Sequence, residues 1–204
     1  MYVFRVMKAD VASFKTADIL VAVIFAVVAR VYALFGSPVF NGWLISLGPV
    51  GQFLGTFAVG ILYFILLLSA IVRGNMLVAF VASMLMAVVR VFTGDPFGPV
   101  AFQAYLVGGL TGWIAYAAMR NRHSYWSWVL AGWWFSMGVD FVFYTFYLPV
   151  APIFGSVAIG YVADVIVYRL ILGFVLAAVL MPVGNWMYKS EALRGVVRRA
   201  VVAA

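Results

Sequence analysis

Charged and amide side chains interrupt the long apolar runs of this chain. If these runs cross a bilayer, each ionised group near its centre costs roughly 2.5–3.5 kcal/mol, so such groups usually face a bundle interior and pair there. The sequence therefore predicts an interior polar site in which a carboxylate neutralises a guanidinium; a network that only fixes the bundle is the alternative. The residues are Arg30, Arg90, Gln103, Asp140, Asp164 and Arg169.

Aromatic side chains lie near the same ends of these runs, among them Trp43, Tyr105, Tyr144 and Tyr161. Stacking rings with a few placed hydrogen-bonding groups suit a small planar molecule. For each ring taken alone, packing in the core or against lipid is the alternative.

The residues that most enzymes depend on are scarce. There is no cysteine, and His123, the one histidine, lies in a basic turn. The chain has no H-E-x-x-H, G-x-S-x-G or Walker sequence. We therefore expect no enzymatic activity, no cofactor and no metal site, and any ATP-driven step would need a partner chain.

Composition sets the class of protein. Of the 204 residues, 67% are hydrophobic and 9% charged, whereas soluble domains are about 25% charged. A polytopic membrane protein of the all-α class is expected, with six transmembrane helices. It would have a short amphipathic segment at residues 1–16, which lies on the membrane surface, and a basic tail at 188–204. The six spans cover about residues 17–35, 51–72, 76–92, 100–119, 126–148 and 157–187.

Lys and Arg are distributed unevenly among the connections. The loops at 36–50, 93–99 and 149–156 contain none, whereas the other connections and both termini carry them. This asymmetry predicts that both termini are cytoplasmic, in a multi-pass protein of the cell membrane. It also explains the net charge of +7 without nucleic acid. On this topology most of the interior polar groups lie in the outer half of the membrane.

Two further patterns concern helix ends and helix packing. Pro96 and Pro99 lack backbone donors and disfavour helix in the residues before them, so a hinge is expected at 93–99. Small residues recur at intervals of three or four, which lets helices approach closely in lipid. These stripes fit packing inside the bundle, and the one in the first span could instead dock another membrane protein. They are Ala22, Ala26 and Ala29, Gly51 and Gly55, and Gly108 and Gly112.

The chain resembles a known family in its six spans, its Ala22-x-x-x-Ala26 stripe and its long first outer loop. Further likeness lies in the hinge at 93–98, in Gln103 and in the glycine-rich run 108–112. These features are similar to the S components of energy-coupling factor (ECF) vitamin transporters. The hairpin is nearest to the YkoE-like branch, which is associated with hydroxymethylpyrimidine and thiamine precursors.

The resemblance implies a substrate-capturing subunit of an ECF-type ABC importer. It would bind a vitamin or precursor of the thiamine class from outside, between spans four to six, with loop 36–50 as a lid. It would dock through Ala22, Ala26 and Ala29 onto a transmembrane coupling subunit driven by two ATPase subunits. The aspartates would offset positive charge on the ligand, Gln103 would fix a ring edge, and the aromatic residues would stack. The expected substrate-binding residues are Trp43, Arg90, Gln103, Asp140, Tyr144, Tyr161 and Asp164.

Two other classes stay open at this stage. An intramembrane lipid-modifying enzyme would use Asp140 or Asp164 as acid or base, and a structural or accessory subunit would use its charges only to hold helices together. The sequence leaves open which ligand is bound and which oligomer forms. It also leaves open whether Arg30, Arg90 and Arg169 contact the substrate or only pair with Asp140 and Asp164, and whether the coupling module is shared.

Overall fold

The computed structural model describes residues 1–36, 38–39, 42–43, 46–47, 49–95, 98–119 and 124–142, with short helical pieces between 171 and 186. For residues 49–59 it describes the backbone alone. All regular elements within these ranges are helical, which confirms the all-α class. They are α1 (Tyr2–Ala12), α2 (Thr16–Val31), the π-helical turn η1 (Tyr32–Gly36), α4 (Pro49–Arg73), α5 (Met76–Phe92), α6 (Gly98–Ala118) and α7 (Tyr125–Val142).

α1 lies within residues 1–16, and the other long helices overlap the residue ranges expected for the first five spans. Within the described residues, Thr16–Gly36 and Gly98–Ala118 are long and apolar enough to cross a membrane. α6 begins at Gly98 rather than at residue 100, because Pro99 is tolerated in the first turn of a helix. The end of the fifth span lies outside the described residues, as does most of the sixth together with the basic tail.

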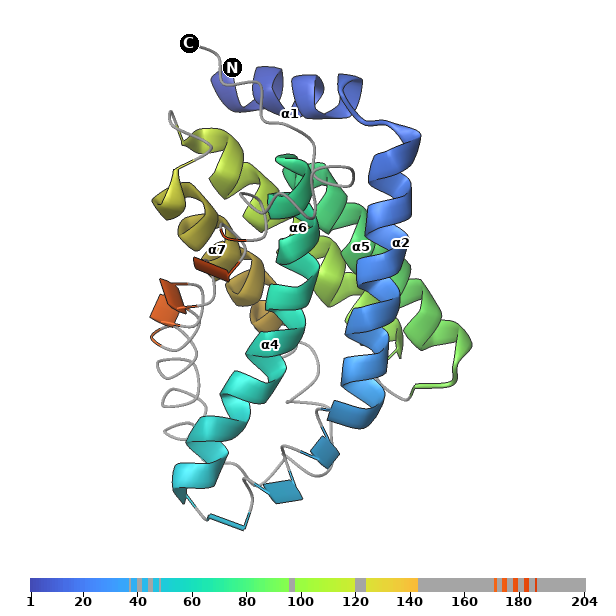
Figure 1. The fold of residues 1–204 in the computed structure, drawn as a ribbon, viewed down its shortest axis with the longest axis vertical. Coiled ribbons are helices and arrows are strands. Elements are labelled where there is room, and N and C mark those ends of the chain that lie inside the picture. The colour runs from blue at the N-terminus through green and yellow to red at the C-terminus, as the bar shows by residue number, and fades with distance from the viewer. Residues whose placement is uncertain are drawn as a thin grey trace.

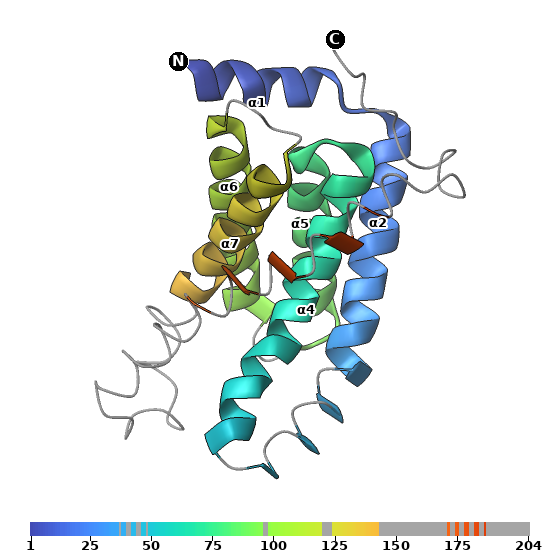
Figure 2. The same cartoon turned by 60° about the vertical axis from the view of Figure 1, so that its left-hand side comes forward.

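The five long helices lie side by side, and α1 lies crosswise over one end of them (Figures 1 and 2). α6 packs against both α5 and α7, while α2 packs against α4 and α5. α1 touches the same end of α5 and α6. The buried core runs through the middle of this bundle, so a polar side chain that points inward has no water around it.

Glycines on both α6 and α7 bring these two helices close together. A Cβ at Gly138 would lie 2.3 Å from the Thr111 hydroxyl and 2.8 Å from the Cα of Gly108. A Cβ at Gly108 would lie 2.7 Å from the carbonyl oxygen of Phe135. The Thr111 hydroxyl is 2.9 Å from the carbonyl oxygen of Trp134 across the interface. The glycine stripe of α6 is therefore used for packing within the chain, as small residues are in membrane bundles.

The alanine stripe of α2 also points inward. Ala22, Ala26 and Ala29 are all buried, so these side chains are not on the surface of the free chain, where a docking stripe was expected. The physical reason is that small side chains let α2 approach α4 and α5 closely. The exposed face of α2 is apolar instead and consists of Ile19, Leu20, Val23, Ile24, Val27, Val28 and Val31.

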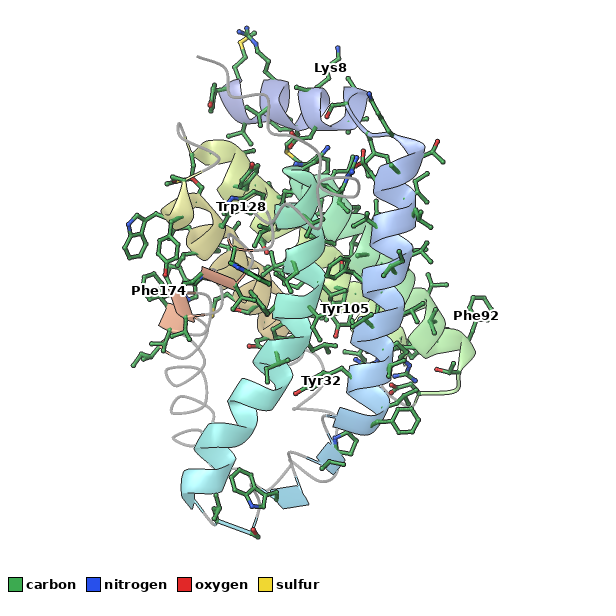
Figure 3. All side chains as sticks on the ribbon, in the orientation of Figure 1. Lys8, Tyr32, Phe92, Tyr105, Trp128 and Phe174 are labelled. Carbon is green, nitrogen blue, oxygen red and sulfur yellow. The ribbon has the colours of Figure 1, made fainter. Side chains whose placement is uncertain are left out.

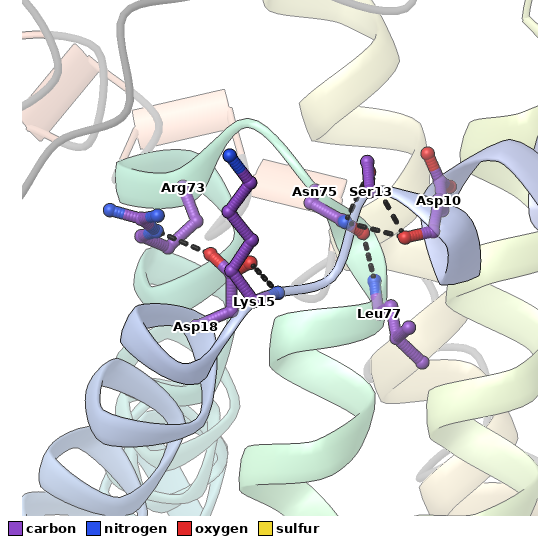
Figure 4. Close-up of polar contacts among 7 residues, drawn as sticks. All are labelled: Asp10, Ser13, Lys15, Asp18, Arg73, Asn75 and Leu77. Atoms are coloured by element: carbon purple, nitrogen blue, oxygen red, sulfur yellow. Dashed lines mark hydrogen bonds and ion pairs between the residues drawn. The ribbon is translucent and has the colours of Figure 1, made fainter.

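A polar cluster fastens α1 to the bundle (Figure 4). Asp10 accepts a hydrogen bond from Trp113 Nε1 of α6 at 2.9 Å, and its backbone carbonyl accepts one from Asn75 Nδ2 at 3.0 Å. Asn75 also caps α5, because its Oδ1 accepts from Leu77 N at 2.9 Å. At the same end of the bundle, Asp18 of α2 pairs with Arg73 of α4 at 2.5 Å. We call Asp10, Asp18, Arg73, Asn75 and Trp113 the α1 latch.

Candidate functional site

A second polar cluster lies at the end of the bundle opposite α1, where α2 ends and α5 turns into α6. Two arginines meet one carboxylate oxygen there: Arg30 NH1 is 3.1 Å and Arg90 Nε is 2.9 Å from Asp95 Oδ2. Arg30 NH2 also donates to the hydroxyl of Thr93 at 2.7 Å. We call Arg30, Arg90, Thr93 and Asp95 the arginine cluster.

The turn after α5 places Asp95 beside Arg90. Asp95 N donates to the carbonyl oxygen of Arg90 at 3.1 Å, and Gly94 N donates to that of Val91 at 3.2 Å. These two bonds form a Schellman motif, which requires a left-handed residue after the helix end. Gly94 supplies it, with a φ of 68°. The chain therefore folds back at Gly94 and returns Asp95 to the last turn of α5.

The arginine cluster is largely shielded from water. The side chains of Arg30, Arg90 and Asp95 are 10%, 14% and 12% exposed. The Nε of Arg30 is buried and has no hydrogen-bond partner in the described part of the chain. Two guanidinium groups thus share a single carboxylate oxygen, and one donor of Arg30 is unused.

A tyrosine–aspartate cluster lies further inside the bundle and consists of Tyr63, Tyr105, Phe135 and Asp140. Tyr63 donates a hydrogen bond to Asp140 Oδ1 at 3.1 Å. Its ring meets those of Tyr105 and Phe135 edge to face, with centroids 6.4 Å and 6.1 Å apart. Tyr105 and Asp140 are buried, and Figure 3 shows Tyr105 within the bundle. This cluster places aromatic rings next to a buried carboxyl group.

Tyr105 lies between the two clusters, because its buried side chain interacts electrostatically with Arg90 as well as with Asp140. Polar groups from α2, α4, α5, α6 and α7 therefore follow one another from the end of the bundle to its interior. They begin with guanidinium groups and end with a carboxylate. Buried polar groups of this kind, beside aromatic rings, suit the recognition of a small molecule. Within the described residues, no three His, Cys, Asp or Glu side chains come together as a metal site.

The expected substrate-binding residues differ in where they lie relative to the two clusters. Arg90 belongs to the arginine cluster and Asp140 to the tyrosine–aspartate cluster. Trp43 is 62% exposed and Gln103 is also exposed, so neither side chain is within the two clusters. Tyr144, Tyr161 and Asp164 lie outside the described residues, as does Arg169.

The expected ion pairs need a correction. Asp140 and Asp164 were the carboxylates expected to neutralise Arg30 and Arg90. Within the described residues both arginines bind Asp95, and a pairing with Asp164 lies outside these residues. Sequence reasoning placed Asp95 in the hinge without giving it a partner, because the hinge was treated as a break rather than as a folded turn. It also missed Tyr63, although a phenol in the middle of an apolar helix needs a hydrogen-bond partner when buried. That rule is the signal that would have found it.

Comparisons with known proteins show which family the chain belongs to. A solved structure titled "Crystal structure of an S-component of ECF transporter" has the same fold, with a TM-score of 0.63, 26% sequence identity and coverage of 90% of both chains. The sequence model of the family "ABC-type cobalt transport system, permease component" matches residues 17–139. The chain therefore belongs to this family of transport permease components, which are integral membrane proteins. No curated protein matches it.

Proposed function

We propose that the chain is the substrate-capturing S component of an ECF-type importer. The observation that carries this proposal is the row of buried polar and aromatic groups from the arginine cluster to Asp140, inside a fold shared with a solved S component. A bundle held together only by packing has no need of such a row, because buried charges cost free energy unless they are matched. The row would bind and orient a small solute.

The substrate that fits these residues is a small organic molecule with an aromatic ring. The family description names cobalt, but the chain has no cysteine and one histidine, and imidazole and thiolate are the side chains that favour such transition metals. A carboxyl group at Asp140 with the rings of Tyr63 and Tyr105 nearby favours a ring that carries a hydrogen-bond donor or a positive charge. Within this class, hydroxymethylpyrimidine and thiamine precursors are proposed on the resemblance of the hinge and hairpin alone.

Import would need partner chains. The sequence holds no nucleotide-binding motif, so ATP hydrolysis is assigned to two ATPase subunits that act through a transmembrane coupling subunit. The absence of Lys and Arg from loops 36–50 and 93–99 supports an outward arginine cluster and cytoplasmic termini. Docking through Ala22, Ala26 and Ala29 would require α2 to move relative to its neighbours, because these alanines are buried.

Titration calorimetry on the purified chain without partners tests this function. We expect a pyrimidine or thiazole precursor to bind with saturable heat, and Co²⁺ to give none. Saturable binding of Co²⁺ alone would contradict the organic substrate. Chemical turnover of a lipid by the chain alone would instead indicate an enzyme, and no binding across the panel by folded protein would indicate an accessory subunit.

A further inference from the structure

The arginine cluster holds more positive than negative charge. Arg30 and Arg90 each carry a guanidinium that stays protonated in proteins, and both pair with one carboxylate, Asp95. The other described carboxylates are engaged elsewhere, in the tyrosine–aspartate cluster and in the α1 latch. Within the described residues, two cations of the arginine cluster therefore face a single anion.

The hydrogen bonds of the two guanidinium groups leave room for another acceptor. Each group reaches Asp95 through a single nitrogen, and both contact the same oxygen, Oδ2. Arginine binds a carboxylate or a phosphate most strongly through two parallel bonds, and neither arginine makes such a pair with Asp95. Arg30 Nε, moreover, is buried without a hydrogen-bond partner in the described part of the chain. These donors suit a further anionic acceptor.

A role in packing alone does not explain two arginines at this place. The side chain of Arg30 is only 10% exposed, and a charge removed from water needs an opposite charge and hydrogen bonds to offset its lost hydration. Arg90 and Asp95 alone would form a matched pair. The second guanidinium instead favours recognition of a ligand, because its planar fork matches the geometry of carboxylate and phosphate groups.

The arginine cluster is reached from the end of the bundle. Thr93 and Gly94, in the turn after α5, are exposed, and the Thr93 hydroxyl is 2.7 Å from Arg30 NH2. A group that arrives beside this turn therefore meets the guanidinium groups before it meets the apolar core. An anion can bind there without crossing the interior of the bundle.

We propose that the arginine cluster binds an anionic group of the substrate, either a carboxylate or a phosphate. Arg30 Nε supplies a donor, the unmatched positive charge supplies the attraction, and Asp95 keeps the two guanidinium groups oriented. We call this the anion subsite. The inference rests on the function proposed above and extends it, because the captured molecule then carries an acidic group as well as a ring.

Titration calorimetry on the full chain, in neutral detergent and phosphate-free buffer, tests this proposal with one pyrimidine ring in three forms. The ring carries a hydroxymethyl group, the phosphate ester of that group, or a carboxylate at the same position. We expect wild type to bind at least one acidic form more tightly than the neutral alcohol, by roughly tenfold or more, as for hydrogen bonds to charged groups. The form with the larger gain distinguishes phosphate from carboxylate. Equal affinity for all three forms would overturn the anion subsite and leave the capture of a ring in place.

Variants of Arg30 assign the preference for the acidic form to the arginine cluster. R30Q removes the excess charge but leaves Arg90 and Asp95 as a matched pair, so it should fold and lose the preference. R30K keeps the charge without the planar fork and should lose part of the preference, which makes it the second variant if R30Q does not fold. R5Q removes the same charge from an exposed position on α1 and should keep the preference. An unchanged preference in folded R30Q, or an equal loss in R5Q, would overturn the proposal.

Inorganic phosphate separates this inference from the function on which it rests. At constant ionic strength, phosphate should raise the unfolding temperature of wild type above its value in chloride, because a ligand that binds only the folded state stabilises it, and should not do so in R30Q. If no ring binds but this stabilisation is seen, the proposed organic substrate is contradicted and the anion subsite stands. If neither is seen, the anion subsite is contradicted as well.

Discussion

The two ends of the bundle use the same residue types in different ways. At the α1 end, Asp18 pairs with one arginine, Arg73, and this carboxylate is 0% exposed. At the other end, two arginines share Asp95, and Arg30 Nε has no hydrogen-bond partner among the residues that the structure describes. Matched charges fix a fold, whereas unmatched donors in a shielded place are available to a ligand. From this difference we propose that the α1 latch stabilises the fold and that the arginine cluster takes part in ligand recognition.

The largest effect on stability is expected from Asp18→Asn. It leaves the buried Arg73 guanidinium without its carboxylate, which costs about 3–5 kcal/mol for a buried pair. Thermal unfolding in detergent measures this loss. Ligand affinity of the folded fraction should not change, because the α1 latch is far from the candidate site. If Asp18→Asn lost as much ligand affinity as Asp95→Asn, the proposed difference between a structural end and a ligand-binding end would be contradicted.

Asp95→Asn should cost less stability and more affinity. The asparagine oxygen still accepts a hydrogen bond, so the loss in unfolding free energy is expected to be about 2–3 kcal/mol. The two arginines lose the group that orients them, and ligand affinity should fall by about tenfold. Calorimetry and thermal unfolding on the same preparation separate these effects. Thr93→Ser keeps a hydroxyl at the same turn and serves as the control.

Tyr63→Phe should have a smaller effect, confined to the tyrosine–aspartate cluster. It removes the hydrogen bond to Asp140 while the edge contacts of the ring with Tyr105 and Phe135 stay in place. The expected loss of stability is about 1–2 kcal/mol. Unfolding measurements check it, and ligand affinity should change in the same preparation. A ligand affinity identical to that of wild type would show that Tyr63 does not contribute to ligand binding.

The double variant R5Q/K8Q should have the smallest effect on stability, within about 0.5 kcal/mol, because both side chains are exposed and lie outside the α1 latch. Thermal unfolding in a neutral detergent measures it. A large loss would show that Arg5 and Lys8 also hold α1 to the bundle, which the hydrogen bonds of Asp10 and Asn75 do not require.

The sequence predicts the helices better than it predicts their contacts. Helix limits follow from local chemistry: Pro49 opens α4, Asn75 caps α5, and Gly94 ends it. The inward face of α2 does not follow, since a stripe of alanines is equally suited to packing within the chain or against a partner. That Ala22, Ala26 and Ala29 are buried in the free chain is seen only once the neighbouring helices are placed.

Prediction of the candidate site from the sequence has the same limit. Arg90 and Asp140 were expected because charges inside apolar runs are costly. The partner of Arg90 was missed because the hinge was treated as a break in the chain, and helix spacing rules pair residues three or four apart but not five. Arg90 and Asp95 are five apart, but the helix ends between them and the left-handed Gly94 turns the chain back. Pairing across a folded turn depends on a backbone conformation that spacing rules for helices do not contain.

The central claim is that the chain itself captures a small molecule through groups that include Asp140. The most direct test is native mass spectrometry of the chain purified without partners, comparing wild type with Asp140→Asn and with Phe141→Ala, an exposed neighbour on α7. We predict a retained small organic molecule in wild type and in Phe141→Ala, and its loss in Asp140→Asn. Equal retention by folded Asp140→Asn and wild type would contradict the account.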